Sequence, residues 1–181
     1  MDLPGAAAIP GFRERFGEPA DTRALVALIN VAFQPEQIAI SGDRIDAERL
    51  QPLFGNGKFF VLEDGTAVAG CVYVEARGNC GYVGLLSVRP ELQGRGLGKR
   101  LMALAENHLA GAGCDRADLR TISARHDLVP MYRHLGYAET GTSPMPPEIP
   151  LKIPCHFINM SKPLGSSGRQ QQRAISGGSQ P

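Results

Sequence analysis

The chain has 181 residues, of which 43% are hydrophobic and 20% are charged, as in an ordinary soluble globular protein. Its 19 basic side chains nearly balance its 18 acidic ones, which argues against a protein that binds nucleic acid or an anionic membrane through a basic face. The length suits one domain built around a single hydrophobic core.

The cysteines and the N-terminal segment indicate the cellular setting. Neither a Cys-x-x-Cys pair nor a paired histidine spacing accompanies the four cysteines, which are Cys71, Cys80, Cys114 and Cys155. The pattern therefore favours neither a zinc site nor a disulfide framework. The N-terminal segment has no basic region followed by an apolar stretch, and no run of about 18 apolar residues occurs anywhere. We expect a reduced cytoplasmic protein without a metal, a membrane contact or a nucleic-acid partner.

Composition also predicts where the folded domain begins and ends. We expect a flexible N-terminus over residues 1–10, one folded domain over residues 11–164 and a disordered tail over residues 165–181. Ile175 is the only large apolar residue of the tail, so the tail buries too little surface to offset its chain entropy.

The first third of the folded region predicts one strand and two helical stretches. Residues 12–16 are the expected strand, and the helix after it is capped by Asp21 and ended by Pro35. One face of this helix is apolar at the spacing i, i+3, i+4 and i+7, through Leu25, Leu28, Ile29 and Ala32. A short helical stretch is expected over residues 46–54, made irregular by Pro52.

The middle of the chain predicts three strands. Residues 58–63 and 66–75 are rich in Val, Phe and Tyr, and Asp64-Gly65 joins them as a two-residue hairpin turn with positive φ at both positions. Residues 81–89 form the next expected strand, which Pro90 stops.

The remaining elements alternate between helix and strand. A long amphipathic helix is expected over residues 95–112 and a second helix over residues 127–135, with a strand at 118–124 between them. A short strand after Gly136 and a last strand over residues 157–164 complete the pattern. We therefore expect an α/β fold with a mixed, mostly antiparallel central sheet and helices on both faces.

A glycine-rich turn between a strand and a helix is the most informative segment. Residues 85–100 read LLSVRPELQGRGLGKR, which places free backbone N–H groups at the positive end of a helix dipole. The glycines at 94, 96 and 98 let the backbone approach an anion closely, and Arg95, Lys99 and Arg100 add positive charge. The segment thus predicts a site for a diphosphate-sized anion.

Two common glycine-loop ligands do not fit the spacing. A nucleoside triphosphate loop needs Gly where Gln93 stands and a hydroxyl residue where Arg100 stands. A dinucleotide loop needs a third Gly where Lys99 stands, and it would open the first βαβ unit of the fold.

The segment resembles the Gln/Arg-x-x-Gly-x-Gly/Ala motif of the GNAT acetyltransferases through Gln93, Gly96 and Gly98. Two neighbouring features strengthen the resemblance: the strand end Leu-Ser-Val-Arg-Pro at residues 86–90, and the segment YRHLGY at residues 132–137, which is similar to the family's Tyr-x-x-x-Gly-Phe/Tyr. The resemblance covers roughly residues 12–164 and agrees with the order of the predicted elements.

The resemblance implies a GNAT acyl-CoA N-acyltransferase fold and acetyl-CoA as co-substrate. It implies that the strand residues Leu86, Ser87 and Val88 offer backbone groups to the pantetheine arm. It also implies a pyrophosphate site, at Gln93, Gly94, Arg95, Gly96, Leu97, Gly98 and Lys99. Tyr132 is expected near the CoA sulfur, where this family's tyrosine often protonates the departing thiolate. The acceptor amine, on a small molecule or a peptide, attacks the thioester directly in a ternary complex, and many relatives are homodimers.

The group that deprotonates the amine stays open in the sequence. Residues 81–89 contain no Asp or Glu where some relatives carry a glutamate base, which leaves Glu75 and His156 as candidates. Cys155 and His156 are adjacent on a strand and face opposite sides, which argues against a nucleophilic pair. Because no base is obvious, a non-catalytic acyl-CoA-binding regulatory domain is the alternative function.

Three further features have two interpretations each. Tyr132 either serves as the proton donor or packs the helix onto the sheet with its hydroxyl at the rim. Arg125 stands where many relatives have Asn, and it binds a CoA phosphate, binds an acidic group of the acceptor, or pairs with Asp127. The loop rich in proline over residues 144–154 is expected to be extended and could form a wall of the acceptor site.

Overall fold

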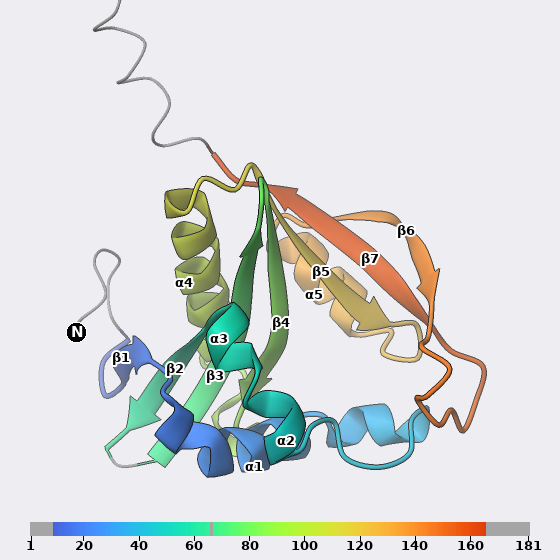
Figure 1. Cartoon of the computed structure of the whole chain (residues 1–181), viewed down its shortest axis with the longest axis horizontal. Helices are drawn as coiled ribbons and strands as arrows, with labels where there is room; N and C mark the ends of the chain where they lie inside the picture. Colours follow the sequence, from blue (N-terminus) through green and yellow to red (C-terminus); the bar gives the residue numbers. More distant parts are fainter. Residues whose placement is uncertain (1–8, 66, 166–181) are drawn as a thin grey trace, which may run out of the picture.

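The computed structural model describes residues 9–65 and 67–165 (Figure 1). Almost all of the two segments that we expected to be flexible, residues 1–10 and 165–181, lie outside these described residues. The described part of the expected domain folds around one sheet, with the N-terminal and C-terminal halves contributing neighbouring strands.

The described residues form a seven-stranded sheet in the order β1-β2-β3-β4-β5-β7-β6. Its strands are β1 (Arg13–Phe16), β2 (Lys58–Asp64), β3 (Ala67–Arg77), β4 (Cys80–Val88), β5 (Arg116–Ile122), β6 (Ala138–Pro144) and β7 (His156–Pro163). β4 and β5 run parallel, and every other neighbouring pair is antiparallel. The predicted mixed, mostly antiparallel sheet is confirmed.

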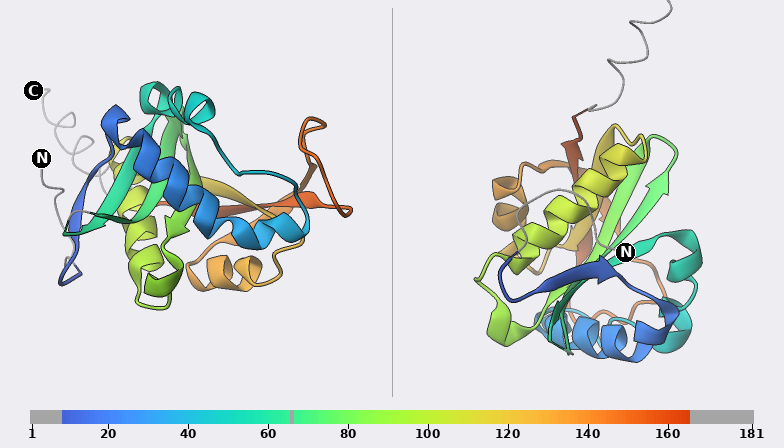
Figure 2. Two further views of the ribbon diagram at one scale, coloured as in Figure 1. Left: turned by 90° about the horizontal axis from the view of Figure 1, so that it is seen from below. Right: turned by 90° about the vertical axis from the view of Figure 1, so that its left-hand side faces the viewer.

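Helices cover both faces of this sheet, as predicted (Figure 2). On one face lie α1 (Thr22–Ala32), α2 (Ala47–Leu50) and α3 (Leu53–Asn56), and on the other lie α4 (Leu97–Gly111) and α5 (Leu128–His134). The apolar stripe of α4 is fully buried at Leu97, Leu101 and Leu109, and each such side chain stabilises the fold by about 1.5–3 kcal/mol. No helix within residues 9–65 and 67–165 is long and apolar enough to cross a membrane.

β4 and β5 separate soon after they meet. Among the described residues, their pairing is limited to Cys80, Gly81 and Tyr82 opposite Arg116, Ala117 and Asp118. Beyond this point β4 continues alongside β3 alone. In Figure 1, β4 and β5 diverge from each other. The register of β3 and β4 shifts in this stretch, and Leu85 has a φ of 52°, a left-handed conformation that costs energy in a branched residue. The divergence leaves an opening in the sheet bordered by the strained residue.

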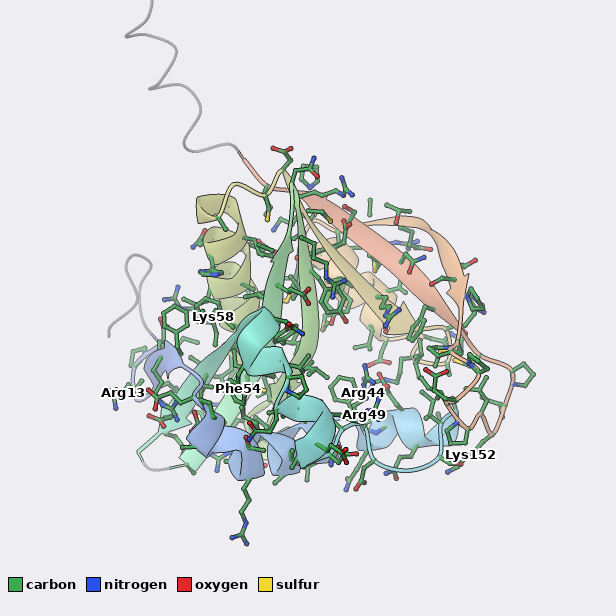
Figure 3. All side chains as sticks on the ribbon, viewed as in Figure 1. Arg13, Arg44, Arg49, Phe54, Lys58 and Lys152 are labelled. Atoms are coloured by element: carbon green, nitrogen blue, oxygen red, sulfur yellow. The ribbon has the colours of Figure 1, made fainter. Side chains whose placement is uncertain are left out.

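Three local predictions were wrong in detail. The helical stretch 46–54 is two short helices, because Pro52 has no N–H to continue α2. Phe54 of α3 (Figure 3) packs against Phe59 of β2, with the ring centroids 5.2 Å apart. Asp21 precedes α1 but does not cap it, since its carboxylate accepts hydrogen bonds from Arg15 at 2.7 and 2.8 Å. Asp64 pairs with Ala67 as the last residue of β2 and has no positive φ, whereas Gly65 has the expected positive φ of 64°.

Candidate functional site

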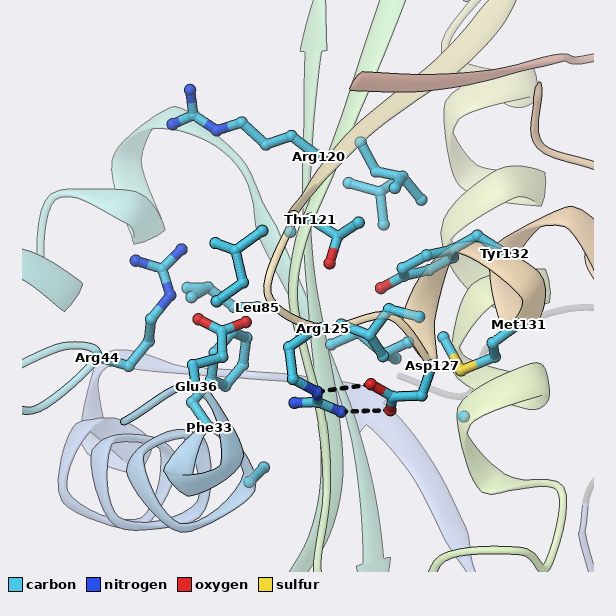
Figure 4. A pocket seen from close by; sticks show the side chains of 18 of the residues that line it. Phe33, Glu36, Arg44, Leu85, Arg120, Thr121, Arg125, Asp127, Met131 and Tyr132 are labelled. Atoms are coloured by element: carbon cyan, nitrogen blue, oxygen red, sulfur yellow. Dashed lines mark hydrogen bonds and ion pairs between the residues drawn. The ribbon is translucent and has the colours of Figure 1, made fainter. Parts of the chain in front are cut away.

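A cavity of about 340 Å³ opens where β4 and β5 separate (Figure 4). The glycine-rich turn before α4 borders one end, and the walls come from β4, β5, α5 and the short 3-10 helix η2 (Gln34–Ile38). The cavity therefore joins the predicted anion site to the middle of the sheet.

The glycines of the turn are needed for backbone conformation. Gly94 and Gly96 have φ values of 75° and 85°, which residues with a side chain rarely adopt. A Cβ atom at either position would meet nothing within 4 Å. The space around both glycines is therefore open beside the first turn of α4, as a close approach of an anion to the backbone requires.

Six of the residues expected to bind the cofactor line this cavity: Leu86, Val88, Gln93, Gly94, Leu97 and Gly98. The side-chain amide of Gln93 donates to the Val88 carbonyl at 3.2 Å, which ties the turn to the end of β4. The loop geometry thus holds the start of α4 beside the open edge of β4.

The other four expected cofactor residues do not line the cavity. The Ser87 side chain is buried and donates to the Leu85 carbonyl at 3.1 Å. Gly96 immediately precedes α4, where its carbonyl accepts from the Arg100 N–H at 3.0 Å. The Arg95 guanidinium lies 5.7 Å from the centre of the Phe12 ring, and Lys99 is exposed.

Arg100 does not add charge to the turn, contrary to the sequence argument. It is buried under β1, where its Nη2 donates to Glu14 Oε2 at 2.6 Å. The positive charge is neutralised by this carboxylate, so Arg95 and Lys99 are the cations of the turn that remain exposed.

Tyr132 of α5 points its hydroxyl into the cavity, toward Thr121 of β5 (Figure 4). Its ring also packs edge-on against the Tyr137 ring, with the ring centroids 6.0 Å apart. The packing interpretation and the proton-donor interpretation of Tyr132 are therefore compatible. Burial, and after it the negative charge of Glu36, raises the pKa of the Tyr132 phenol above its ordinary value. The hydroxyl therefore keeps its proton across the neutral range and can donate it.

Glu36 is the residue of the site that sequence reasoning missed. It lies on η2, is only 8% exposed, and faces the cavity from the wall opposite Tyr132 (Figure 4). Its carboxylate has no hydrogen bond or ion pair within residues 9–65 and 67–165. Burial raises the pKa of the carboxyl, although the charges of Arg44 and Arg125 act to lower it. A lone glutamate next to Gln37, directly after Pro35, carries no sequence signal of burial.

The two base candidates chosen from the sequence lie elsewhere. Glu75 accepts from Arg77 at 2.7 and 2.9 Å and from the Tyr73 hydroxyl at 3.2 Å. The hydrogen bonds from Arg77 hold the pKa of Glu75 below its ordinary value, which makes it a weak base. His156 is exposed at the start of β7 and does not line the cavity.

Two polar residues of β5 and its following turn complete the wall. Arg125 forms a two-point ion pair with Asp127, at 2.9 and 2.8 Å, which is one of the three alternatives left open by the sequence. Thr121 is 4% exposed, and its hydroxyl has no hydrogen-bond partner in the described part of the chain. A buried hydroxyl without a partner is costly, which is expected where a ligand supplies the missing bond.

The proline-rich loop packs against η2 and closes one side of the site. The Ser41 N–H donates to the Pro150 carbonyl at 2.9 Å, and the Lys152 N–H donates to the Ala39 carbonyl at 2.8 Å. Met145 and Ile149 from this loop line the cavity. The loop thus forms part of the cavity wall on the side of η2.

Comparisons with known proteins identify the family of this chain. The sequence profile described as the acetyltransferase (GNAT) family matches residues 24–137, more than half of the chain. This chain belongs to the GNAT acetyltransferase family. A mycothiol acetyltransferase of Streptomyces coelicolor is 30% identical over 150 residues, which cover 80% of this chain and 48% of the relative. The chain therefore spans about half the length of the curated relatives it matches.

Solved structures of acetyltransferases share the fold. The ribosomal-protein-S18-alanine N-acetyltransferase of Escherichia coli aligns with a TM-score of 0.69 at 17% identity, over 88% of this chain and 97% of that one. A nourseothricin acetyltransferase aligns with a TM-score of 0.69 at 19% identity, over 86% of this chain and 99% of that one. The GNAT fold is thus confirmed.

Proposed function

We propose that the protein transfers an acetyl group from acetyl-CoA to an amine of a small molecule or peptide, by direct attack in a ternary complex. One observation carries the proposal: a single cavity connects the glycine-bordered start of α4, the opening between β4 and β5, and the side chains of Tyr132 and Glu36. The α4 end suits the diphosphate of CoA, because free N–H groups and the helix dipole favour an anion there. The open edge of β4 suits the pantetheine arm.

The acceptor must lose a proton before or during attack. Amines of the lysine type have a pKa of about 10.4 and are mostly protonated at neutral pH. We assign the proton acceptor to Glu36, whose carboxylate faces the cavity and whose pKa is raised by burial toward the range of an efficient base. The amine nitrogen attacks the thioester carbon, its proton passes to Glu36, and the carbon–sulfur bond breaks. The departing thiolate takes a proton from the Tyr132 hydroxyl.

Binding of acetyl-CoA to a Gly96→Glu variant tests the cofactor site. We expect calorimetric titration to show at least about 100-fold weaker binding, because the new carboxylate repels the pyrophosphate and the side chain strains the φ of 85° at this position. Gly113→Glu is the matched control, since Gly113 has a φ of 87° and equally open surroundings at the far end of α4. Equal affinity of the two variants for acetyl-CoA would contradict a pyrophosphate site at the turn before α4.

Removal of the Tyr132 hydroxyl tests the proton donor. Tyr132→Phe keeps the edge-on packing with Tyr137, and we expect kcat to fall roughly 100-fold, near the lower limit for general acid catalysis, because a thiolate is a fair leaving group. Stopped-flow detection of free thiol at pH 6 to 10 measures the effect. Turnover that matches the unmodified protein across this range would leave Tyr132 with packing alone.

Catalysis can be tested by screening amines as acetyl acceptors. The screen should include an acceptor of the mycothiol type, because the curated relatives are named mycothiol acetyltransferases. Acceptor-dependent thiol release by this chain would establish catalysis. Tight binding of acetyl-CoA without release for any amine would instead favour the non-catalytic acyl-CoA-binding alternative.

A further inference from the structure

A second cavity, of about 500 Å³, lies on the face of the sheet that carries α2. It shares five lining residues with the first cavity: Arg44, Tyr82, Leu85, Leu119 and Arg120. The two cavities therefore meet at the opening between β4 and β5, beside Glu36. A molecule in the second cavity can reach the reacting groups from the side opposite α4.

The charges that line the second cavity are unevenly paired. Its carboxylates are already engaged, since Glu75 pairs with Arg77 and Asp118 pairs with Arg116. By contrast, Arg44, Arg49 and Arg120 have no ion pair within the residues that the structure describes. The cavity therefore presents an excess of positive charge to a ligand.

Arg44 is held in place without a hydrogen-bond partner. Its Nε is buried and makes no hydrogen bond in the described part of the chain, and its guanidinium lies 5.2 Å from the centre of the Phe33 ring. Glu36 attracts it electrostatically but forms no ion pair with it. A buried guanidinium N–H without an acceptor is costly, which points to an acceptor supplied by a ligand.

The other two arginines come from different elements. Arg49 lies on α2, near Arg44 in Figure 3, and also lines a third cavity together with Arg44. Arg120 of β5 is stacked on Phe157 of β7, with its guanidinium 4.3 Å from the ring centre. The stacking limits the freedom of the guanidinium, so less entropy is lost when it binds an anion.

We propose that the second cavity binds an anionic group of the acceptor, a carboxylate or a phosphate, through Arg44, Arg49 and Arg120. The acceptor is then an amine that also carries an acid, and the arginines orient its nitrogen toward the opening where Glu36 lies. The inference rests on the proposed function and adds the chemical class of the acceptor. Planar guanidinium groups suit both carboxylates and phosphates, so the test includes both.

Matched pairs of amines distinguish the anion from the rest of the acceptor. Phenylalanine against phenylalaninamide tests the carboxylate, and O-phosphoethanolamine against ethanolamine tests the phosphate. We expect the anionic member of at least one pair to show kcat/KM about 10- to 100-fold higher, the effect of a charge-assisted hydrogen bond. Acetyl-CoA-dependent thiol release is the measurement, at one ionic strength.

Single arginine variants assign the effect to the cavity. Arg44→Gln should lower the preference for the anionic over the neutral acceptor about tenfold, mainly by raising KM for the anionic acceptor. Arg49→Gln is the second variant, because Arg49 is exposed and its removal does not disturb buried packing. Arg23→Gln is the control, since Arg23 is exposed on α1 and lines none of these cavities.

The outcomes separate this inference from the function on which it rests. Equal kcat/KM for both members of every pair, or no release from any member by protein that binds acetyl-CoA, would overturn the anionic acceptor. Failure to bind acetyl-CoA at all would overturn the proposed function itself. Discrimination that survives in both Arg44→Gln and Arg49→Gln would also overturn the assignment to this cavity.

Discussion

Glu36→Gln is expected to lower kcat about 100- to 10,000-fold, the range for loss of a general base. The affinity for acetyl-CoA should stay unchanged, because Glu36 lies on η2, across the cavity from α5 and away from the glycine-bordered end. Thiol release and calorimetric titration measure the two quantities separately. Glu48→Gln is the matched control, since Glu48 is exposed on α2.

The rate of acetyl transfer should depend on pH through the ionisation of Glu36. A base works only when it is ionised, so the rate should fall as pH decreases through the pKa of Glu36. Burial raises that pKa, so the fall should lie above the ordinary glutamate value of about 4.3. Glu36→Gln should lose this limb, leaving a slow rate that follows the ionisation of the amine alone. An unchanged acidic limb in the variant would assign the base to another group.

Stability should change in the opposite direction to activity. Because the folded-state pKa of Glu36 is raised, its favourable contribution is full below the unfolded pKa of about 4.3 and is lost as pH rises through the folded pKa. Glu36→Gln should therefore be as stable as the unmodified protein near pH 4 and more stable at pH 8. Urea unfolding at both values measures the difference. A variant that is inactive and less stable at pH 8 would indicate structural damage instead.

The second large effect concerns stability. Arg100→Met is expected to destabilise the fold by about 3–5 kcal/mol, because it leaves the Glu14 carboxylate buried without its partner. Arg100 and Glu14 side chains are only 8% and 9% exposed, and they join α4 to β1. The double variant Glu14→Leu/Arg100→Met should recover much of the loss, since it removes both buried charges and adds apolar contact.

An exposed ion pair provides the matched control for this prediction. Arg133 and Glu139 also form an ion pair, but their side chains are 62% and 39% exposed. Arg133→Met should therefore cost no more than about 1 kcal/mol. Urea unfolding of the four proteins gives the free energies. Similar losses for Arg100→Met and Arg133→Met would show that burial does not decide the strength of these pairs.

Local sequence patterns determined the order and type of most elements. The apolar spacing of α4, the glycine-rich turn before it and the β-rich runs of β2, β3 and β4 are signals carried by neighbouring residues. The same signals placed Tyr132 on a helix and Gln93 and Gly94 beside the start of α4, where the structure has them. Local patterns of this kind predict helices and strands because backbone conformation depends mainly on adjacent residues.

Only the tertiary structure decided which charges are paired and which are buried. Arg100 looks like a cation of the glycine turn in the sequence, but it pairs with Glu14, which lies 86 positions away. Asp21 looks like a helix cap, but Arg15 binds its carboxylate. Glu36 looks like a solvated residue after Pro35, but η2 and the proline-rich loop enclose it against β4 and β5. Desolvation and pairing depend on segments distant in the chain, so no local pattern records them.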